Sequence, residues 1–79
     1  MKELRKSIDD VDKNIVLLLA ERLSLARRIS EFKKERGIPL FQPKREKEIL
    51  VKITELAKEK GLREDYVKGL FSRMIEESK

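Results

Sequence analysis

The sequence predicts an all-α fold made of three helices, one long and two shorter. Apolar side chains recur with the alternating spacing of four and three residues that is typical of a helix seam. Breaks at Gly37, Pro39 and Gly61 divide the chain into three helical segments. We therefore expect residues 1–79 to form one helical domain.

The first helix is predicted to run from about Lys2 to Lys34, because this range contains neither glycine nor proline. A helix of this length extends over roughly 45–50 Å. Eight of the nine positions in its seam are apolar. The seam consists of Leu4, Ile8, Val11, Ile15, Leu18, Arg22, Leu25, Ile29 and Phe32.

The two shorter helices follow a loop predicted over Glu35–Gln42. Pro43 suits the first position of the second helix, and Gly61 suits the cap at its end. The third helix is predicted to begin near Arg63. Their predicted apolar faces are Ile49, Ile53, Leu56 and Ala57 in the second helix, and Val67, Leu70, Phe71, Met74 and Ile75 in the third.

The second and third helices do not provide enough surface to bury the long first helix from all sides. A chain of 79 residues buries only about 60% of its unfolded surface. The two shorter helices together can cover one side of the long helix, whereas Leu17, Leu19 and Leu23 add apolar surface outside the seam. We therefore predict an intertwined homodimeric helical bundle.

Arg22 interrupts the apolar seam of the first helix. A buried guanidinium without a partner costs several kcal/mol, and no acid occupies another seam position. Its partner must come from another helix, another chain or a bound anion. Arg5 and Lys33 each directly follow a seam residue, which predicts that this helix faces a negatively charged group. A structural salt bridge for Arg22 and snorkelling side chains for the other two remain alternatives.

Spacing limits how these cations can act together. Arg22 and Lys33 are 11 positions apart, about 16 Å along a helix, so their side chains could share a ring-sized ligand. Arg5 lies 17 positions before Arg22, about 25 Å away. One chain cannot bring both to the same small molecule, but an antiparallel dimer could.

Arg45 and Glu46 border the apolar face of the second helix and could bind carboxylate and hydroxyl groups, although they could also be ordinary first-turn charges.

Composition excludes several classes of chemistry. Cysteine and histidine are absent, which removes disulfides, Cys/His zinc sites and catalytic pairs that use histidine. We expect no metal and no cofactor.

No stretch is long and apolar enough for a transmembrane helix, and no signal-peptide pattern is present, which predicts a cytoplasmic location without membrane contact. The net charge of +5 suits an anionic partner, and the 44% of charged residues resembles a thermophile composition.

An ordered set of residues runs through the whole chain. It consists of Leu4-Arg5, Ile8, Asp12, Leu18-Leu19-Ala20-Glu21-Arg22, Leu25-Ala26, Lys33, Arg45-Glu46, Tyr66, Leu70-Phe71 and Ile75-Glu76-Glu77-Ser78. In this order and spacing the sequence resembles the all-helical chorismate mutases. The resemblance implies an intertwined homodimer with two sites that converts chorismate to prephenate by a Claisen-type rearrangement.

The resemblance also implies the roles of individual residues. Arg22 and Arg45, with Arg5 from the other chain, would bind the substrate carboxylates. Lys33 would contact the ether oxygen, Glu46 the ring hydroxyl, and Ser78 a carboxylate. The expected substrate site also includes Gln42, Ile49 and Ile75.

Two positions depart from the family pattern. Gln42 stands where many members carry an acid, three residues before the Arg-Glu pair. The Gln or Glu expected one turn beyond Ser78 is not in the sequence, so either the sequence is shortened or the site has one donor fewer.

The sequence is also compatible with three other functions. An isochorismate-pyruvate lyase would share this fold and a similar cationic site. A basic module that binds nucleic acid would use Arg27-Arg28 and Lys33-Lys34, but acids are interleaved with these cations and aromatic residues for stacking are few. A purely structural dimerisation module leaves Arg22 unexplained, and fusion to other pathway domains stays open. We expect chorismate as the partner, and no nucleic acid.

Overall fold

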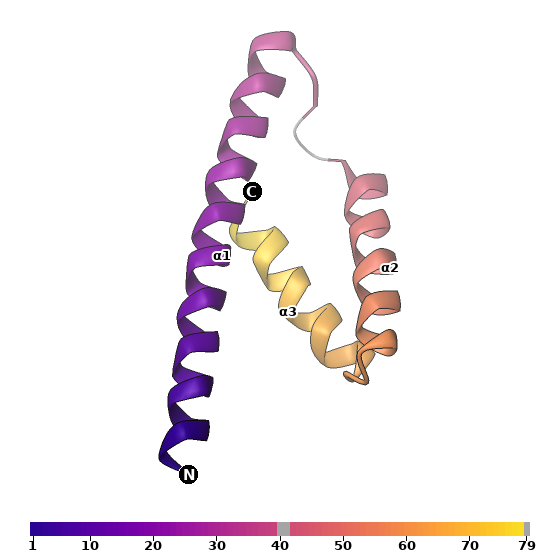
Figure 1. Cartoon of the computed structure of the whole chain (residues 1–79). Helices are drawn as coiled ribbons and strands as arrows, with labels where there is room; N and C mark the ends of the chain where they lie inside the picture. The colour runs from indigo at the N-terminus through magenta and orange to yellow at the C-terminus, as the bar shows by residue number, and fades with distance from the viewer. Residues whose placement is uncertain (40–41, 79) are drawn as a thin grey trace.

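The computed structural model describes residues 1–39 and 42–78 and confirms the all-α fold. The long helix α1 spans Lys2–Arg36, α2 spans Pro43–Glu59 and α3 spans Glu64–Glu77. Figure 1 shows α1 alongside the pair formed by α2 and α3, with the end of α3 near the middle of α1. Over the described residues, no helix has the length and apolar character needed to cross a membrane. Positions 40 and 41 of the predicted loop lie outside the described residues.

The end of α1 is set by Gly37, which adopts the left-handed conformation with φ 67°. Its N–H donates to the carbonyl of Lys34 at 3.3 Å, and the N–H of Ile38 donates to the carbonyl of Lys33 at 2.8 Å. This pair of hydrogen bonds is a Schellman motif, in which the glycine directly follows the helix. The helix therefore continues to Arg36, two residues beyond the predicted end. Lys33 is held in its last turn.

The ends of α2 follow the local signals in the sequence. Pro43 occupies the first position, as predicted, because its missing N–H costs nothing there. The helix ends at Glu59 with Lys60 as its cap, and Gly61 is the left-handed residue that follows, with φ 72°. The N–H of Leu62 donates to the carbonyl of Ala57 at 2.8 Å. The chain can then turn back into α3.

The core of the single chain lies between α2 and α3 and is small. Among the described residues, only Ala57 and Val67 are buried, with 2% and 8% of their surface exposed. Ile53 and Phe71 are half-buried on the same faces. Leu56, which the sequence placed on the apolar face of α2, remains 49% exposed. Two short helices thus shield only a few side chains from water.

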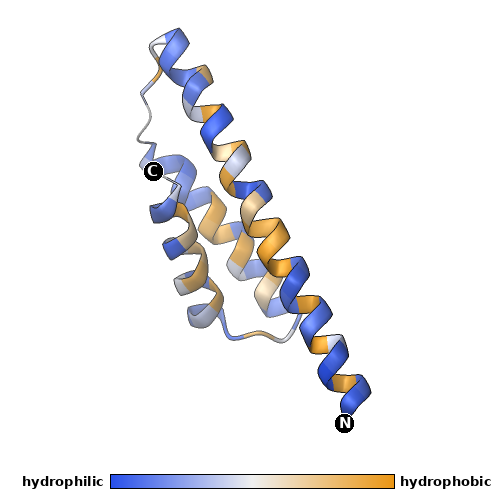
Figure 2. Cartoon of the chain, turned by 90° about the vertical axis from the view of Figure 1, so that its left-hand side faces the viewer, coloured by the Kyte–Doolittle hydropathy of each residue, from blue (hydrophilic) through white to orange (hydrophobic). Residues whose placement is uncertain are grey.

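The apolar seam of α1 is not covered within one chain. None of its residues is buried, and the apolar seam side chains are 47% to 65% exposed, from Leu25 to Leu4. Figure 2 shows apolar segments along α1, including a part that extends past the other two helices. The chain measures 53 Å in its longest dimension and has a radius of gyration of 15.5 Å, against about 12 Å for a compact domain of this length. The second and third helices therefore pack on each other and leave the seam open.

Candidate functional site

A cavity of about 410 Å³ lies where the C-terminal half of α1 faces the first turn of α2 and the last turn of α3. This volume is in the range of small-molecule binding sites. Three cations and one carboxylate border it. Its lining consists of Arg22, Leu25, Ala26, Ile29, Ser30, Lys33, Gln42, Arg45, Glu46, Ile49, Ile75 and Ser78. All of these residues are half-buried or exposed, so the cavity opens to solvent.

The wall contributed by α1 is one continuous face of the helix. Arg22, Ala26, Ser30 and Lys33 follow each other at intervals of four, four and three residues, which places them on the same side. Ala26 and Ser30 are small and leave room between the two long cations. The sequence interpretation did not assign Ser30 to the site. The signal that could have identified it is this spacing between two site cations.

Arg22 reaches the residue that caps the end of α3. Its Nη1 donates a hydrogen bond to the hydroxyl of Ser78 at 3.4 Å. The same hydroxyl lies 3.0 Å from the carbonyl oxygen of Met74 and 2.9 Å from that of Ile75, toward which its own proton can point. The partner that the structure gives Arg22 is therefore a neutral group, and the guanidinium retains donors for an anion.

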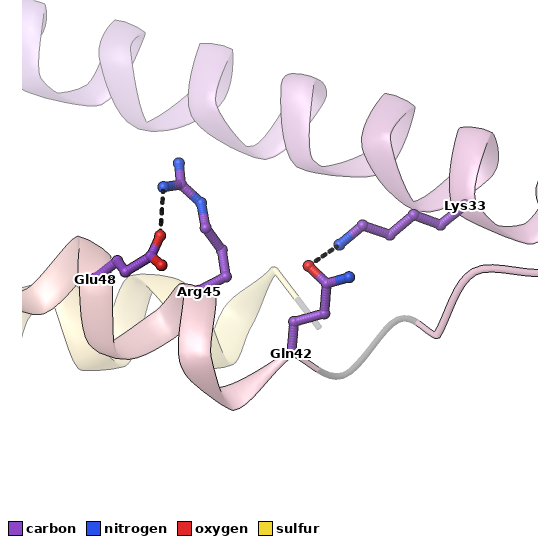
Figure 3. Close-up of polar contacts among 4 residues, drawn as sticks. All are labelled: Lys33, Gln42, Arg45 and Glu48. Carbon is purple, nitrogen blue, oxygen red and sulfur yellow. Dashed lines mark hydrogen bonds and ion pairs between the residues drawn. The ribbon is translucent and has the colours of Figure 1, made fainter.

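Lys33 reaches across to the start of α2. Its Nζ donates to Oε1 of Gln42 at 3.2 Å (Figure 3). Both residues are half-buried. As with Arg22, the acceptor is uncharged, so it does not balance the positive charge of the ammonium, which has two further donors.

Arg45 and Glu46 line the cavity from the first turn of α2. Figure 3 shows the guanidinium of Arg45 extending from α2 toward α1. Its Nη1 lies 3.7 Å from Oε2 of Glu48, in a pair whose side chains are 57% and 51% exposed. An exposed pair of this kind is weak and screened by solvent, so a substrate carboxylate can compete for the guanidinium. The positive end of the α2 dipole adds to the attraction for an anion.

The structure brings together all but one of the site residues predicted from the sequence. Ile49 of α2 and Ile75 of α3 supply apolar surface to the same cavity. Arg5 is the exception, because it is exposed near the start of α1 and lies 17 residues before Arg22. Nothing within one described chain brings it to the cavity.

This arrangement is suited to binding a small anion that also has an apolar body. Guanidinium groups bind carboxylates through two parallel hydrogen bonds, and an ammonium acts as a compact charge. Glu46 adds an acceptor for a hydroxyl group. The cavity can orient a ligand and stabilise negative charge without supplying a nucleophile.

Comparison with known proteins gives a consistent result. The family described as "Chorismate mutase type II" matches residues 4–79. The protein named "Chorismate mutase" from Methanocaldococcus jannaschii is 42% identical over 79 residues, which are 100% of this chain and 80% of that protein. No solved structure gave a significant match.

Longer relatives match over a small part of their own length. A "Bifunctional chorismate mutase/prephenate dehydratase" from Aquifex aeolicus is 51% identical over 59 residues, or 75% of this chain and 16% of that protein. The "T-protein" of Haemophilus influenzae is 31% identical over 78 residues, or 99% of this chain and 21% of that protein. The chain thus spans most of the protein from Methanocaldococcus jannaschii and a small part of these two. Since the family match covers nearly its full length, the chain belongs to the chorismate mutase type II family.

Proposed function

We propose that the cavity between the three helices binds chorismate and catalyses its rearrangement to prephenate, a step of aromatic amino acid biosynthesis. The observation that carries this proposal is the convergence of Arg22, Lys33 and Arg45 on one cavity. Chorismate is a dianion with a substituted six-membered ring, which matches three cations around an apolar lining. Membership of the chorismate mutase type II family supports the same reaction.

The chemistry requires little of the protein beyond geometry and charge. Within one substrate molecule, the ether C–O bond breaks while a C–C bond forms, so no atom is gained or lost. The transition state is compact and places negative charge on the ether oxygen. An enzyme accelerates such a step by holding the compact conformer and by stabilising that charge with fixed donors.

Five polar residues of the cavity have a place in this scheme. Arg22 and Arg45 bind the two carboxylates, with Ser78 assisting beside Arg22. Lys33 donates to the ether oxygen, where charge develops. Glu46 accepts a hydrogen bond from the ring hydroxyl, while Ile49 and Ile75 contact the ring.

The proposal includes a homodimer in which Arg5 of each chain completes the site of the other. Its support is the exposed seam of α1, together with the distance of 17 residues between Arg5 and Arg22. A second, mainly apolar cavity of about 320 Å³ between α1 and α3, lined in part by Leu19, Leu23 and Met74, is further surface that a second chain could cover. A cytoplasmic location and independence of cofactors stay predictions.

The test is an assay of chorismate consumption by absorbance, with the product identified by chromatography. We expect prephenate, formed at an unchanged rate after treatment with a chelator. Strict dependence on a metal would contradict the proposal. Formation of pyruvate from isochorismate as the main activity would assign the cavity to a lyase instead.

A further inference from the structure

Gln42 connects three charged residues of the cavity. Its side-chain Oε1 accepts the hydrogen bond from Nζ of Lys33 at 3.2 Å. Its backbone carbonyl accepts from the N–H of Arg45 at 3.1 Å and from the N–H of Glu46 at 3.2 Å. This one residue therefore joins the last turn of α1 to the first turn of α2 across the cavity (Figure 3).

We propose that Gln42 is a positioning residue that orients the ammonium of Lys33 toward the ether oxygen without neutralising it. This inference rests on the proposed function and replaces the expectation of a substrate contact at this position. An ammonium only donates hydrogen bonds, so the oxygen of the amide must face it. One of the three ammonium donors is then fixed, and two are directed by it into the cavity.

The side chain of Gln42 is not required as a helix cap. Within the described residues it makes no capping hydrogen bond to α2, since the backbone carbonyl supplies the contacts to the first turn. Glutamine is also not among the residues favoured at a helix N-cap. A substitution that removes the amide but keeps the backbone therefore leaves the start of α2 in place. The function of the side chain lies in its contact with Lys33.

The neutrality of the amide is as relevant as its position. With glutamine at position 42, the cavity has three cations and one carboxylate. A carboxylate at this position would form an ion pair with the ammonium and compete with the dianionic substrate for it. The amide provides a similar acceptor without that competition. Gln42→Glu separates the two properties, because it keeps an acceptor of the same length and adds a negative charge.

The first experiment is a set of kinetic measurements on Gln42→Leu, Gln42→Glu, Lys33→Met and the double variant Gln42→Leu/Lys33→Met. We expect Gln42→Leu to lower kcat about tenfold with a much smaller change in KM, because the ammonium loses its orientation but not its charge. Gln42→Glu should recover most of kcat and raise KM. In the Lys33→Met background, Gln42→Leu should have no further effect on kcat, since it acts through the missing lysine. Lys34→Met, next in the chain, exposed and outside the cavity lining, is the matched control.

An equal loss of kcat/KM from Gln42→Leu in both backgrounds would mean that the amide acts on the substrate directly, and this would overturn the proposal. Recovery by Gln42→Glu without a rise in KM would overturn the part that concerns neutrality. Melting temperatures of all variants show whether any loss reflects unfolding.

The second experiment does not depend on activity. NMR relaxation of ¹⁵N-labelled lysine ammonium groups compares Lys33 with Lys34 in the free protein. We expect Lys33 to be the more ordered in the wild type and as mobile as Lys34 in Gln42→Leu. Equal mobility in the wild type would show that the contact is absent and would refute the positioning role. An ordered Lys33 in a protein that does not convert chorismate would instead leave the contact intact and contradict only the proposed function.

Discussion

The three cations of the cavity differ in the groups that hold them. Arg22 donates to the hydroxyl of Ser78 and Lys33 to the amide of Gln42, both uncharged acceptors. Arg45 instead lies near the carboxylate of Glu48. A charged partner attracts a guanidinium more strongly than a neutral one, but this pair is open to solvent and therefore weak. The contacts of Arg22 and Lys33 thus leave their positive charge unbalanced by an acid, and a ligand carboxylate can displace Glu48 from Arg45.

Arg45→Ala should impair catalysis far more than folding. A hydrogen bond to a charged group contributes roughly 1.5–3 kcal/mol, so we expect kcat/KM to fall about 10- to 100-fold or more. The exposed side chain contributes little to the core, and its melting temperature should change little. Lys44→Ala, an exposed neighbour outside the cavity lining, is the control and should keep its activity. A near-normal rate combined with a greatly lowered melting temperature would show that Arg45 is structural.

At the scale of elements, the sequence predicts most of what is local. Pro43 and Gly61 mark the start and end of α2 because their backbone preferences act without help from tertiary contacts. The end of α1 was predicted two residues early, because a break at Gly37 does not by itself reveal that the helix continues up to the glycine. The Schellman hydrogen bonds decide that point, and they require the actual backbone conformation.

In the site, too, the sequence predicts the arrangement of residues along one helix but not the contacts between helices. Spacing along one helix correctly placed Arg22 and Lys33 on a common face. The contact between Arg22 and Ser78 joins residues 56 positions apart, so periodicity within a helix carries no information about it. The pairing of Lys33 with Gln42 depends on how the chain returns between α1 and α2, so spacing along the helix carries no information about it. Partners across helices come from packing, which one-dimensional patterns do not encode.

Two glycines should respond to alanine in opposite directions. Gly37 has a φ of 67°, where a side chain costs about 1–2 kcal/mol, so Gly37→Ala should lower the free energy of unfolding by about that amount. Gly69 lies inside α3 with no atom within 4 Å of an added Cβ. Gly69→Ala should therefore raise the free energy of unfolding by about 0.5–1 kcal/mol. Urea denaturation of both variants at one protein concentration is the measurement.

Each of these variants serves as the reference for the other. Unchanged stability in Gly37→Ala would show that the left-handed glycine does not set the end of α1. A loss of stability in Gly69→Ala would indicate that another chain packs closely against α3 at this point, where the single chain leaves open space.

At the scale of the whole molecule, one chain does not provide an adequate core. Its described residues bury only Ala57 and Val67, while eight apolar side chains along the seam of α1 remain about half exposed or more. A monomeric domain seldom exposes an apolar surface that extends so far without a partner. The same helix presents Arg5 far from the cavity of its own chain. The proposed antiparallel second chain would account for both the open seam and the separated arginine.

The proposed sharing of sites can be tested by complementation between two inactive variants. Arg5→Ala and Arg22→Ala homodimers should each be nearly inactive, because each lacks one substrate-binding arginine in both sites. Unfolding and refolding them together in equal amounts should give about half heterodimers by random pairing. If each site takes Arg5 from the partner and Arg22 from its own chain, one site of a heterodimer lacks both arginines and the other lacks neither. Activity should then return to about a quarter of the wild-type value per chain.

The alternative arrangement gives a different result in the same mixture. If Arg5 and Arg22 served one site from a single chain, every site in every pairing would lack one of them, and no activity would return. Native mass spectrometry should confirm that heterodimers have formed, so that a lack of recovery cannot be attributed to failed exchange. Lack of recovery with heterodimers present would refute the shared site. Recovery would show that the length of α1, which carries Arg5 some 25 Å from Arg22, allows two chains to complete each other's cavities.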